Sequence, residues 1–276
     1  MRNFLPDVRP ARRTIAALAG PALIVAAVLI LMRDFAFAGK VTGGDIARYW
    51  LPMHCFLGRS LAAGHIPSWT ASALSGTPFA ADPQSGWMSF LPMLLYSTVH
   101  CGTALRWMVV LQPVLAGLGI YWFARAEGLS RVAATVGGLA LAIAISGSRL
   151  PVSIRFPGVL AWTALVLAAA SRYVGARTWS SRLSWVAATA LAWGQVAASH
   201  LTVGLLIGTL ALVAYAVARL RTDVRRGLLA MNEALLLSAV ALVALPSVNL
   251  AYLLPRLAYA SQTSLAMGYG SLQKLS

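Results

Sequence analysis

Long apolar runs separated by short, arginine-rich connections constrain this chain more than any other feature of its sequence. A helix needs about 17–25 predominantly apolar residues to cross the roughly 30 Å hydrocarbon core of a bilayer. Because only helices and closed barrels satisfy their backbone groups in lipid, these runs are expected to be transmembrane helices. The sequence predicts an all-α, polytopic membrane protein, a single transmembrane domain over 1–276, with seven spans at 14–32, 107–124, 132–148, 156–171, 183–199, 201–218 and 227–245.

The basic composition has to be interpreted together with the hydrophobicity. The chain carries 22 Lys+Arg against 7 Asp+Glu, a formal charge of +15, which in a soluble domain would suggest nucleic-acid binding. Here 59% of the residues are hydrophobic and only 11% are charged, and the basic residues lie between the apolar runs. We therefore expect membrane lipids as partners and no nucleic acid.

The arginines also predict an orientation, because short basic loops stay in the cytoplasm. They gather before the first expected span and at every second boundary after it, near 125–131, 172–182 and 219–226. This predicts a cytoplasmic N-terminus, an extracytoplasmic C-terminus and a large first extracytoplasmic loop at 33–106. The alternative is a signal peptide cleaved near Ala36, but the first apolar run exceeds the roughly 7–15 residues of a signal h-region, so we expect an uncleaved helix.

The loop at 33–106 is expected to carry two short helices at the membrane interface. Residues 45–63 place apolar side chains at helical spacing, interrupted at Pro52, and Asp45 is suited to cap this helix. Residues 87–99 are apolar but too short to span, which favours an interfacial or re-entrant helix. Because the loop also holds three of the seven acidic residues and three of the four histidines, we expect the functional site there.

Other polar residues are expected to be structural. The sequence allows one disulfide between Cys55 and Cys101 but does not require it. His54 and His65 are not at metal-ligand spacing with each other, and His200 stands alone, so structural roles are favoured for all three. Glu233, inside the last expected span, is costly in lipid and is expected to be either functional or paired with nearby Arg225 or Arg226.

A resemblance emerges from the turns of the loop. Gly64-x-Ile66-Pro67-x-Trp69, Ser75-Gly76-Thr77-Pro78 and Asp82-Pro83-Gln84-Ser85-Gly86 follow one another after Asp45, Tyr49 and Pro52. This succession resembles the first external loop of YfhO-type bacterial membrane proteins, a group similar to the GT-C superfamily of integral-membrane glycosyltransferases. Two departures are Thr70-Ala71, where the group has Asn-Pro, and a smaller number of spans. They predict either a truncated fragment or a short relative that has lost activity.

The resemblance implies an inverting transfer of a sugar from a polyprenyl-phosphate donor to a cell-envelope acceptor outside the bacterial inner membrane. It implies Asp45 as the general base that takes the acceptor proton. Asp82 is the second candidate, as an orienting residue or a metal ligand, and its alternative role is to start an Asp-Pro turn. The loop residues expected to contact substrate are Tyr49, His65, Trp69 and Gln84.

Positive charge is needed to stabilise the departing phosphate. The expected donor-phosphate residues are Arg149 and Arg155, which flank one short loop, together with Arg48, Arg59 and Arg256. Each could instead anchor the protein to lipid headgroups. No cofactor is required. A divalent metal could share this role, although Asp45 and Asp82 are too few carboxylates to predict one.

Two other functions compete with the transferase. A lipid or solute transporter is expected to carry ion-coupling residues or broken helices near the midplane, and the spans offer few beyond Gln112, Gln195 and Glu233. A non-catalytic scaffold subunit that holds a membrane protein partner also fits a short chain. No P-loop, dinucleotide, zinc or nucleophile-elbow motif supports other chemistry.

Overall fold

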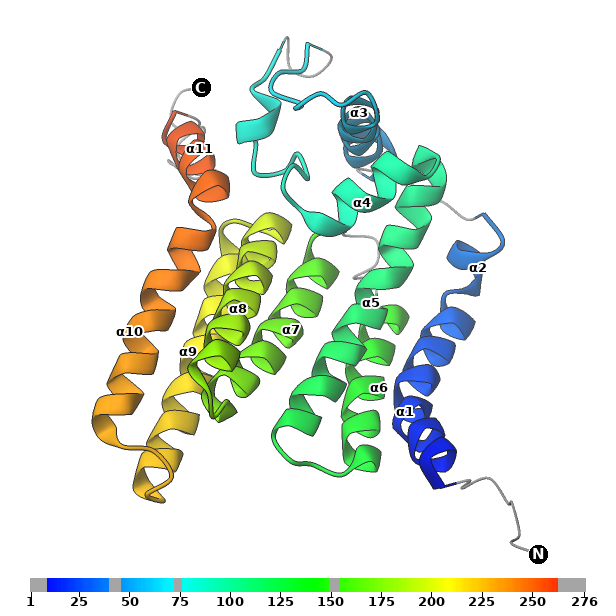
Figure 1. The fold of residues 1–276 in the computed structure, drawn as a ribbon. Coiled ribbons are helices and arrows are strands. Elements are labelled where there is room, and N and C mark those ends of the chain that lie inside the picture. The colour runs from blue at the N-terminus through cyan, green and yellow to red at the C-terminus, as the bar shows by residue number, and fades with distance from the viewer. Residues whose placement is uncertain (1–8, 40–45, 72–75, 149–153, 263–276) are drawn as a thin grey trace, which may run out of the picture.

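The computed structural model describes residues 9–39, 46–71, 76–148 and 154–262, and these are mostly helical (Figure 1). An isolated β-bridge joins Thr70 to Thr77. The helices are α1 (Arg9–Leu31), α2 (Arg33–Ala36), α3 (Leu51–Ala62), α4 (Phe90–Thr98), α5 (Cys101–Ala126), α6 (Arg131–Gly147), α7 (Phe156–Gly175), α8 (Trp179–Ser199), α9 (Val203–Arg225), α10 (Met231–Val248) and α11 (Leu250–Ser261), with short turns η1 (Ile46–Trp50) and η2 (Phe79–Ala81).

Each of the seven expected spans corresponds to one long helix, either α1 or one of α5 to α10. Four helices in the described ranges, α5, α7, α9 and α10, are long and apolar enough to cross a membrane. The apolar parts of α1 and α6 are shorter, and α8 begins with the polar sequence Trp179-Ser180-Ser181-Arg182. The chain is therefore an all-α protein with four candidate spans, and the count of seven stays a prediction.

The core of the bundle lies along α5 and α7. The apolar windows of these two helices are 61% and 56% buried, against 17% in α9 and 11% in α10. Small residues let the central helices approach closely, since a Cβ atom at Gly119 would lie only 2.7 Å from the Cβ of Ala164. On the other side of α5, a Cβ at Gly138 of α6 would lie 2.6 Å from the carbonyl oxygen of Gly117.

The two ends of the bundle differ in character. Helices α3, α4 and α11 gather at one end, together with the loop that includes η2 (Figure 1). The connections from α5 to α6, from α7 to α8 and from α9 to α10 lie at the opposite end (Figure 1), and these are the arginine-rich segments of the sequence. We call the first end the loop end and the second the arginine end.

At Pro52, where an interruption was expected, the structure has a change of helix type. The π-helical turn η1 leads directly into α3, and Pro52 lies in the first turn of that helix. A first-turn residue has no intrahelical acceptor for its N–H, so proline, which lacks one, is tolerated there. Helix α3 packs tightly on α4, because a Cβ atom at Gly58 would lie 2.0 Å from the carbonyl oxygen of Tyr96.

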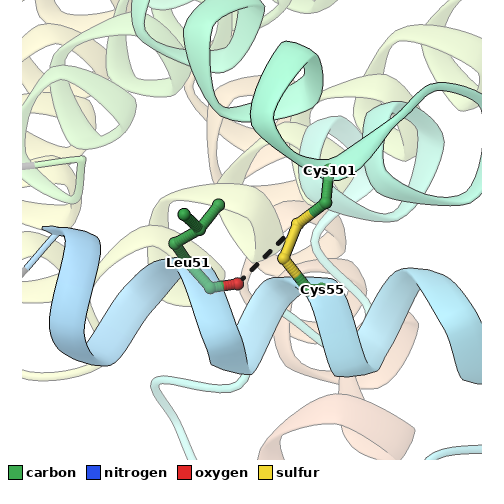
Figure 2. The surroundings of a disulfide bond; sticks show 3 residues. All are labelled: Leu51, Cys55 and Cys101. Carbon is green, nitrogen blue, oxygen red and sulfur yellow. Dashed lines mark hydrogen bonds between the residues drawn. A yellow bond between two sulfur atoms is a disulfide. The ribbon is translucent and has the colours of Figure 1, made fainter. Parts of the chain in front are cut away.

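A disulfide between Cys55 and Cys101 joins α3 to the start of α5 (Figure 2). Their Cα atoms are 5.5 Å apart, and 46 positions separate the two cysteines in the sequence. The carbonyl oxygen of Leu51, one turn before Cys55, lies 3.9 Å from the Sγ of Cys101. The bridge that the sequence allowed without requiring therefore closes a ring that contains most of the loop.

Candidate functional site

The turn at Asp82-Pro83-Gln84-Ser85-Gly86 is ordered by its own side chains. The backbone N–H of Gln84 donates to Oδ1 of Asp82 (2.7 Å), and the hydroxyl of Ser85 donates to the carbonyl oxygen of Asp82 (2.8 Å). The Ser85 hydroxyl also accepts from the N–H of Trp87 (3.2 Å). Asp82 is thus an Asp-Pro turn residue, the alternative role that the sequence offered for it.

Two buried side chains from distant helices hold the next residues, 86–90, which we call the latch segment. Gln195 of α8 accepts from the N–H of Phe90 (2.7 Å) and donates to the carbonyl oxygen of Met88 (3.1 Å). Nη2 of Arg256, on α11, donates to the carbonyl oxygen of Trp87 (2.7 Å). Met88 has a φ of 60°, a conformation that costs a non-glycine residue energy, so these contacts hold a strained turn.

Arg256 is a buried cation, with only 1% of its surface exposed. Its guanidinium lies 3.8 Å from the centre of the Tyr252 ring, and its Nη1 donates to the Tyr252 carbonyl oxygen (3.1 Å). Its Nε has no hydrogen-bond partner among the described residues. Burial lowers the pKa of Arg256, and Tyr252 and Asp82 oppose that shift. Asp82 is therefore close enough to stabilise this charge.

Two of the predicted arginines act on the charge of Asp82. Burial raises the pKa of its carboxyl group, while the Gln84 N–H, Arg256 and Arg155 act in the opposite direction. Burial and the Asp82 charge also raise the pKa of Tyr49 to about 12, and Arg155 opposes that shift. Residues 49, 82, 155 and 256, which the sequence singled out separately, thus influence one another's charge, and we call them the electrostatic cluster of the loop end.

Arg155 precedes α7 and connects this cluster to the bundle. Its Nε donates to the carbonyl oxygen of Ser199 at the end of α8 (3.4 Å), and its guanidinium lies 5.4 Å from the centre of the Trp50 ring. Beside it is a cavity of about 30 Å³, also lined by His54, Gln84 and Gln112. This volume holds about one water molecule and is too small for a sugar.

Several predicted residues lie outside the cluster or outside the described ranges. Asp45 and Arg149 belong to segments that the structure does not describe. Arg48, Arg59 and His65 are exposed, as is Trp69, whose ring covers Gly76 at the tip of the loop. Within the described ranges no three His, Cys, Asp or Glu side chains gather in a way that could hold a metal ion.

Sequence reasoning missed the residues that support the latch segment and the cluster. The sequence indicated Gln195 only as one of few polar residues in the spans, and nothing in it pointed to Tyr252. The sequence feature that could have identified Gln195 is a glutamine inside an apolar run, because a buried polar side chain needs a hydrogen-bond partner. Its partners, 105 and 107 positions away in the sequence, could not be identified without the fold.

At the arginine end, the pairing expected for Glu233 is wrong. Glu233 pairs with Arg182 (2.5 Å) and not with Arg225 or Arg226, because the first turns of α8 and α10 lie at the same end of the bundle. A second acidic residue, Glu127, accepts from Ser171 and Tyr215 and pairs with Arg219 (2.9 Å). Both pairs connect helices, which is a structural role.

His54 illustrates how burial at the loop end makes stability depend on pH. It is 3% exposed between the rings of Trp50 and Tyr96, and burial lowers its pKa from 6.5 to about 4. The folded state therefore binds this proton less readily than the unfolded state. We expect stability to be lost progressively as pH falls from about 6.5 to 4, by about 3 kcal/mol from this residue.

The measurement is the thermal midpoint in detergent between pH 7.5 and 4.5, for the wild type and His54→Gln. The variant should lose less stability than the wild type over this range, and the exposed His65→Gln should behave as the wild type does. Burial also lowers the pKa of His200, so part of the pH dependence will remain in His54→Gln. Identical pH profiles for the wild type and His54→Gln would contradict the effect.

Comparison with protein-family models, with curated proteins and with solved structures gives no match for this chain.

Proposed function

We propose that this chain is a membrane-bound glycosyltransferase similar to the GT-C group, which moves a sugar from a polyprenyl-phosphate donor to a cell-envelope acceptor. The observation that carries the proposal is the cluster of Tyr49, Asp82, Arg155 and Arg256 at the loop end. A carboxylate and two arginines in a partly buried site suit a reaction that moves a proton and releases a phosphate.

In the proposed reaction, the acceptor hydroxyl oxygen bonds to the anomeric carbon as the bond from that carbon to the phosphate breaks. Asp45 takes the hydroxyl proton, and the polyprenyl phosphate leaves with the bonding electrons. Arg155 and Arg256 stabilise its negative charge. Because Arg256 is only 1% exposed, it acts by electrostatic attraction at a distance and not by direct contact. Asp82, with one oxygen held by Gln84, orients the acceptor. The substrates would bind on the open side of the small cavity, next to Tyr49, which is 37% exposed.

The disulfide supports an extracytoplasmic position for this site. Disulfides persist in oxidising compartments and are rare in the cytosol. The Cys55–Cys101 bridge is at the loop end, and the arginines that should stay in the cytoplasm are at the opposite end. Two independent features therefore favour the same orientation, with seven spans, a cytoplasmic N-terminus and the loop end outside the bacterial inner membrane.

The test is native mass spectrometry of the protein purified in mild detergent. We expect an adduct with the mass of a polyprenyl phosphate, with or without a hexose. Arg155→Gln should reduce this adduct about tenfold, because a hydrogen bond to a charged group contributes roughly 1.5–3 kcal/mol. Arg33→Gln, an exposed arginine of the expected loop that is not among the donor-phosphate residues, serves as the matched control. Bulk phospholipids alone on the wild type would contradict the proposal and favour the scaffold or transporter.

A further inference from the structure

A second cavity, remote from the loop end, lies among α7, α8, α9 and α10. Its volume is about 500 Å³, within the range of roughly 300–1,000 Å³ of ligand pockets. Helices α9 and α10 both pack against α8 but scarcely touch each other, and they are the two least buried candidate spans. The cavity is therefore a gap between the outermost helices of the bundle.

The lining of this cavity has nothing to offer a polar ligand. Most of it is aliphatic, including Leu212, Val213, Val217, Leu242 and Leu245. The hydroxyl groups in the lining are already bonded within the protein, by Thr189 to Trp185, Thr209 with Trp193, Ser238 to Ala234, Tyr173 to Leu237 and Tyr215 to Glu127. An apolar occupant loses no hydrogen bonds here, whereas a polar one would.

The length of the cavity suits a lipid chain. The lining residues on α9 run from Thr209 to Leu220, which is about 16 Å of helix and about half of the roughly 30 Å hydrocarbon core. An acyl chain from one leaflet is both thin enough and long enough to occupy it.

The charge at one end of the cavity indicates which class of lipid would bind there. Thr209, Val213 and Val217 line the cavity at a spacing of four residues, and Arg221 and Arg225 continue that row toward the arginine end. Both arginines are exposed. Arginines near the headgroups attract anionic lipids, by roughly 1 kcal/mol each.

We propose that this cavity binds an acyl chain of an anionic phospholipid, with the lipid phosphate at Arg221 and Arg225. The site is separate from the loop end and does not depend on the transferase reaction. It would fill the gap between α9 and α10 and bind a lipid from the leaflet at the arginine end.

The probes are phosphatidylglycerol and phosphatidylcholine with the same acyl chains, added to delipidated protein and counted by native mass spectrometry. We expect Ala216→Trp, which fills the cavity, to lower bound phosphatidylglycerol about tenfold. Leu210→Trp, on the exposed side of α9 outside the lining, should bind as the wild type does. Replacing Arg221 and Arg225 by Gln should reduce the preference for phosphatidylglycerol about thirtyfold.

A second measurement keeps the proposal testable if Ala216→Trp does not fold. Phosphatidylglycerol with brominated acyl chains should quench the fluorescence of Trp193, which lines the cavity, and Trp193→Phe should remove that share of the quenching. Equal phosphatidylglycerol binding by Ala216→Trp and the wild type would overturn the proposal. So would a lipid-free wild-type dimer that Ala216→Trp converts to a monomer, because a second copy would then be the occupant.

Discussion

Replacing Asp45 by asparagine is expected to lower sugar transfer by about 10²–10⁴-fold, the contribution of a general base. The amide keeps the size of the side chain but cannot take the acceptor proton. The unfolding midpoint of Asp45→Asn in detergent should differ from that of the wild type by no more than conservative surface substitutions change it. Initial rates with a polyprenyl-phosphate sugar donor measure the loss. Asp34→Asn, in the same expected loop and exposed beside Arg33, is the matched control and should keep full activity.

Asp82→Asn decides between the two carboxylates. Burial raises the pKa of Asp82, so a reaction that used it as the base would lose activity as pH falls toward a pKa above the usual value of about 3.9. That loss of activity at low pH would be absent in Asp82→Asn. If Asp45→Asn keeps its activity, while Asp82→Asn loses activity and its remaining rate no longer falls at low pH, the assignment of Asp45 is wrong and Asp82 is the base.

Replacing Gln195 by leucine is expected to lower the free energy of unfolding by about 4 kcal/mol. The change leaves the N–H of Phe90 and the carbonyl oxygen of Met88 without their partner. Both hydrogen bonds are partly buried, and each group that loses its partner costs about 1–3 kcal/mol. The latch segment would also be free to relax at Met88, so transfer should fall together with stability. Chemical denaturation in detergent measures the first effect, and the transfer assay measures the second.

Gln112→Leu is the matched control, since it makes the same change at another buried glutamine. Gln112 makes one hydrogen bond, from Nε2 to the carbonyl oxygen of Ile154 (2.9 Å), and its Oε1 has no partner among the described residues. Leucine there removes an unsatisfied acceptor along with that bond, so its cost should be about 1 kcal/mol. Equal losses in the two variants would mean that Gln195 does not hold the latch segment.

Local patterns predicted most of the helices but not the way they bend and end. The seven apolar runs identified α1 and α5 to α10, because apolar length alone is enough to predict a helix. Helix α11 was missed because the last expected run stops at 245 and Pro255 breaks the pattern beyond it. The bend before α11 depends on Asn249, whose side-chain amide donates to the carbonyl oxygens of Ala190 and Leu245 (both 2.8 Å). A contact 59 positions away cannot be inferred from spacing.

The candidate site was predicted in its composition but not in its arrangement. Tyr49, Asp82, Arg155 and Arg256 were chosen one by one, from turn chemistry, loop position and charge. Nothing in their spacing indicated that they meet, because η1, the loop, the start of α7 and α11 converge only when the bundle is complete. Arg48 and Arg59 carry the same charge in the same loop and remain exposed, so residue type alone did not select the members.

The Cys55–Cys101 bridge also bears on how the protein is made. Synthesis runs from the N-terminus, so both cysteines leave the ribosome before α8 and α11 exist. In the proposed orientation the ring can be oxidised as soon as residue 101 has been exported, which ties α3 to α5 early. Gln195 and Arg256 would then dock onto a loop whose ends are already joined. The covalent link thus gives the late helices a prepared surface on which to assemble.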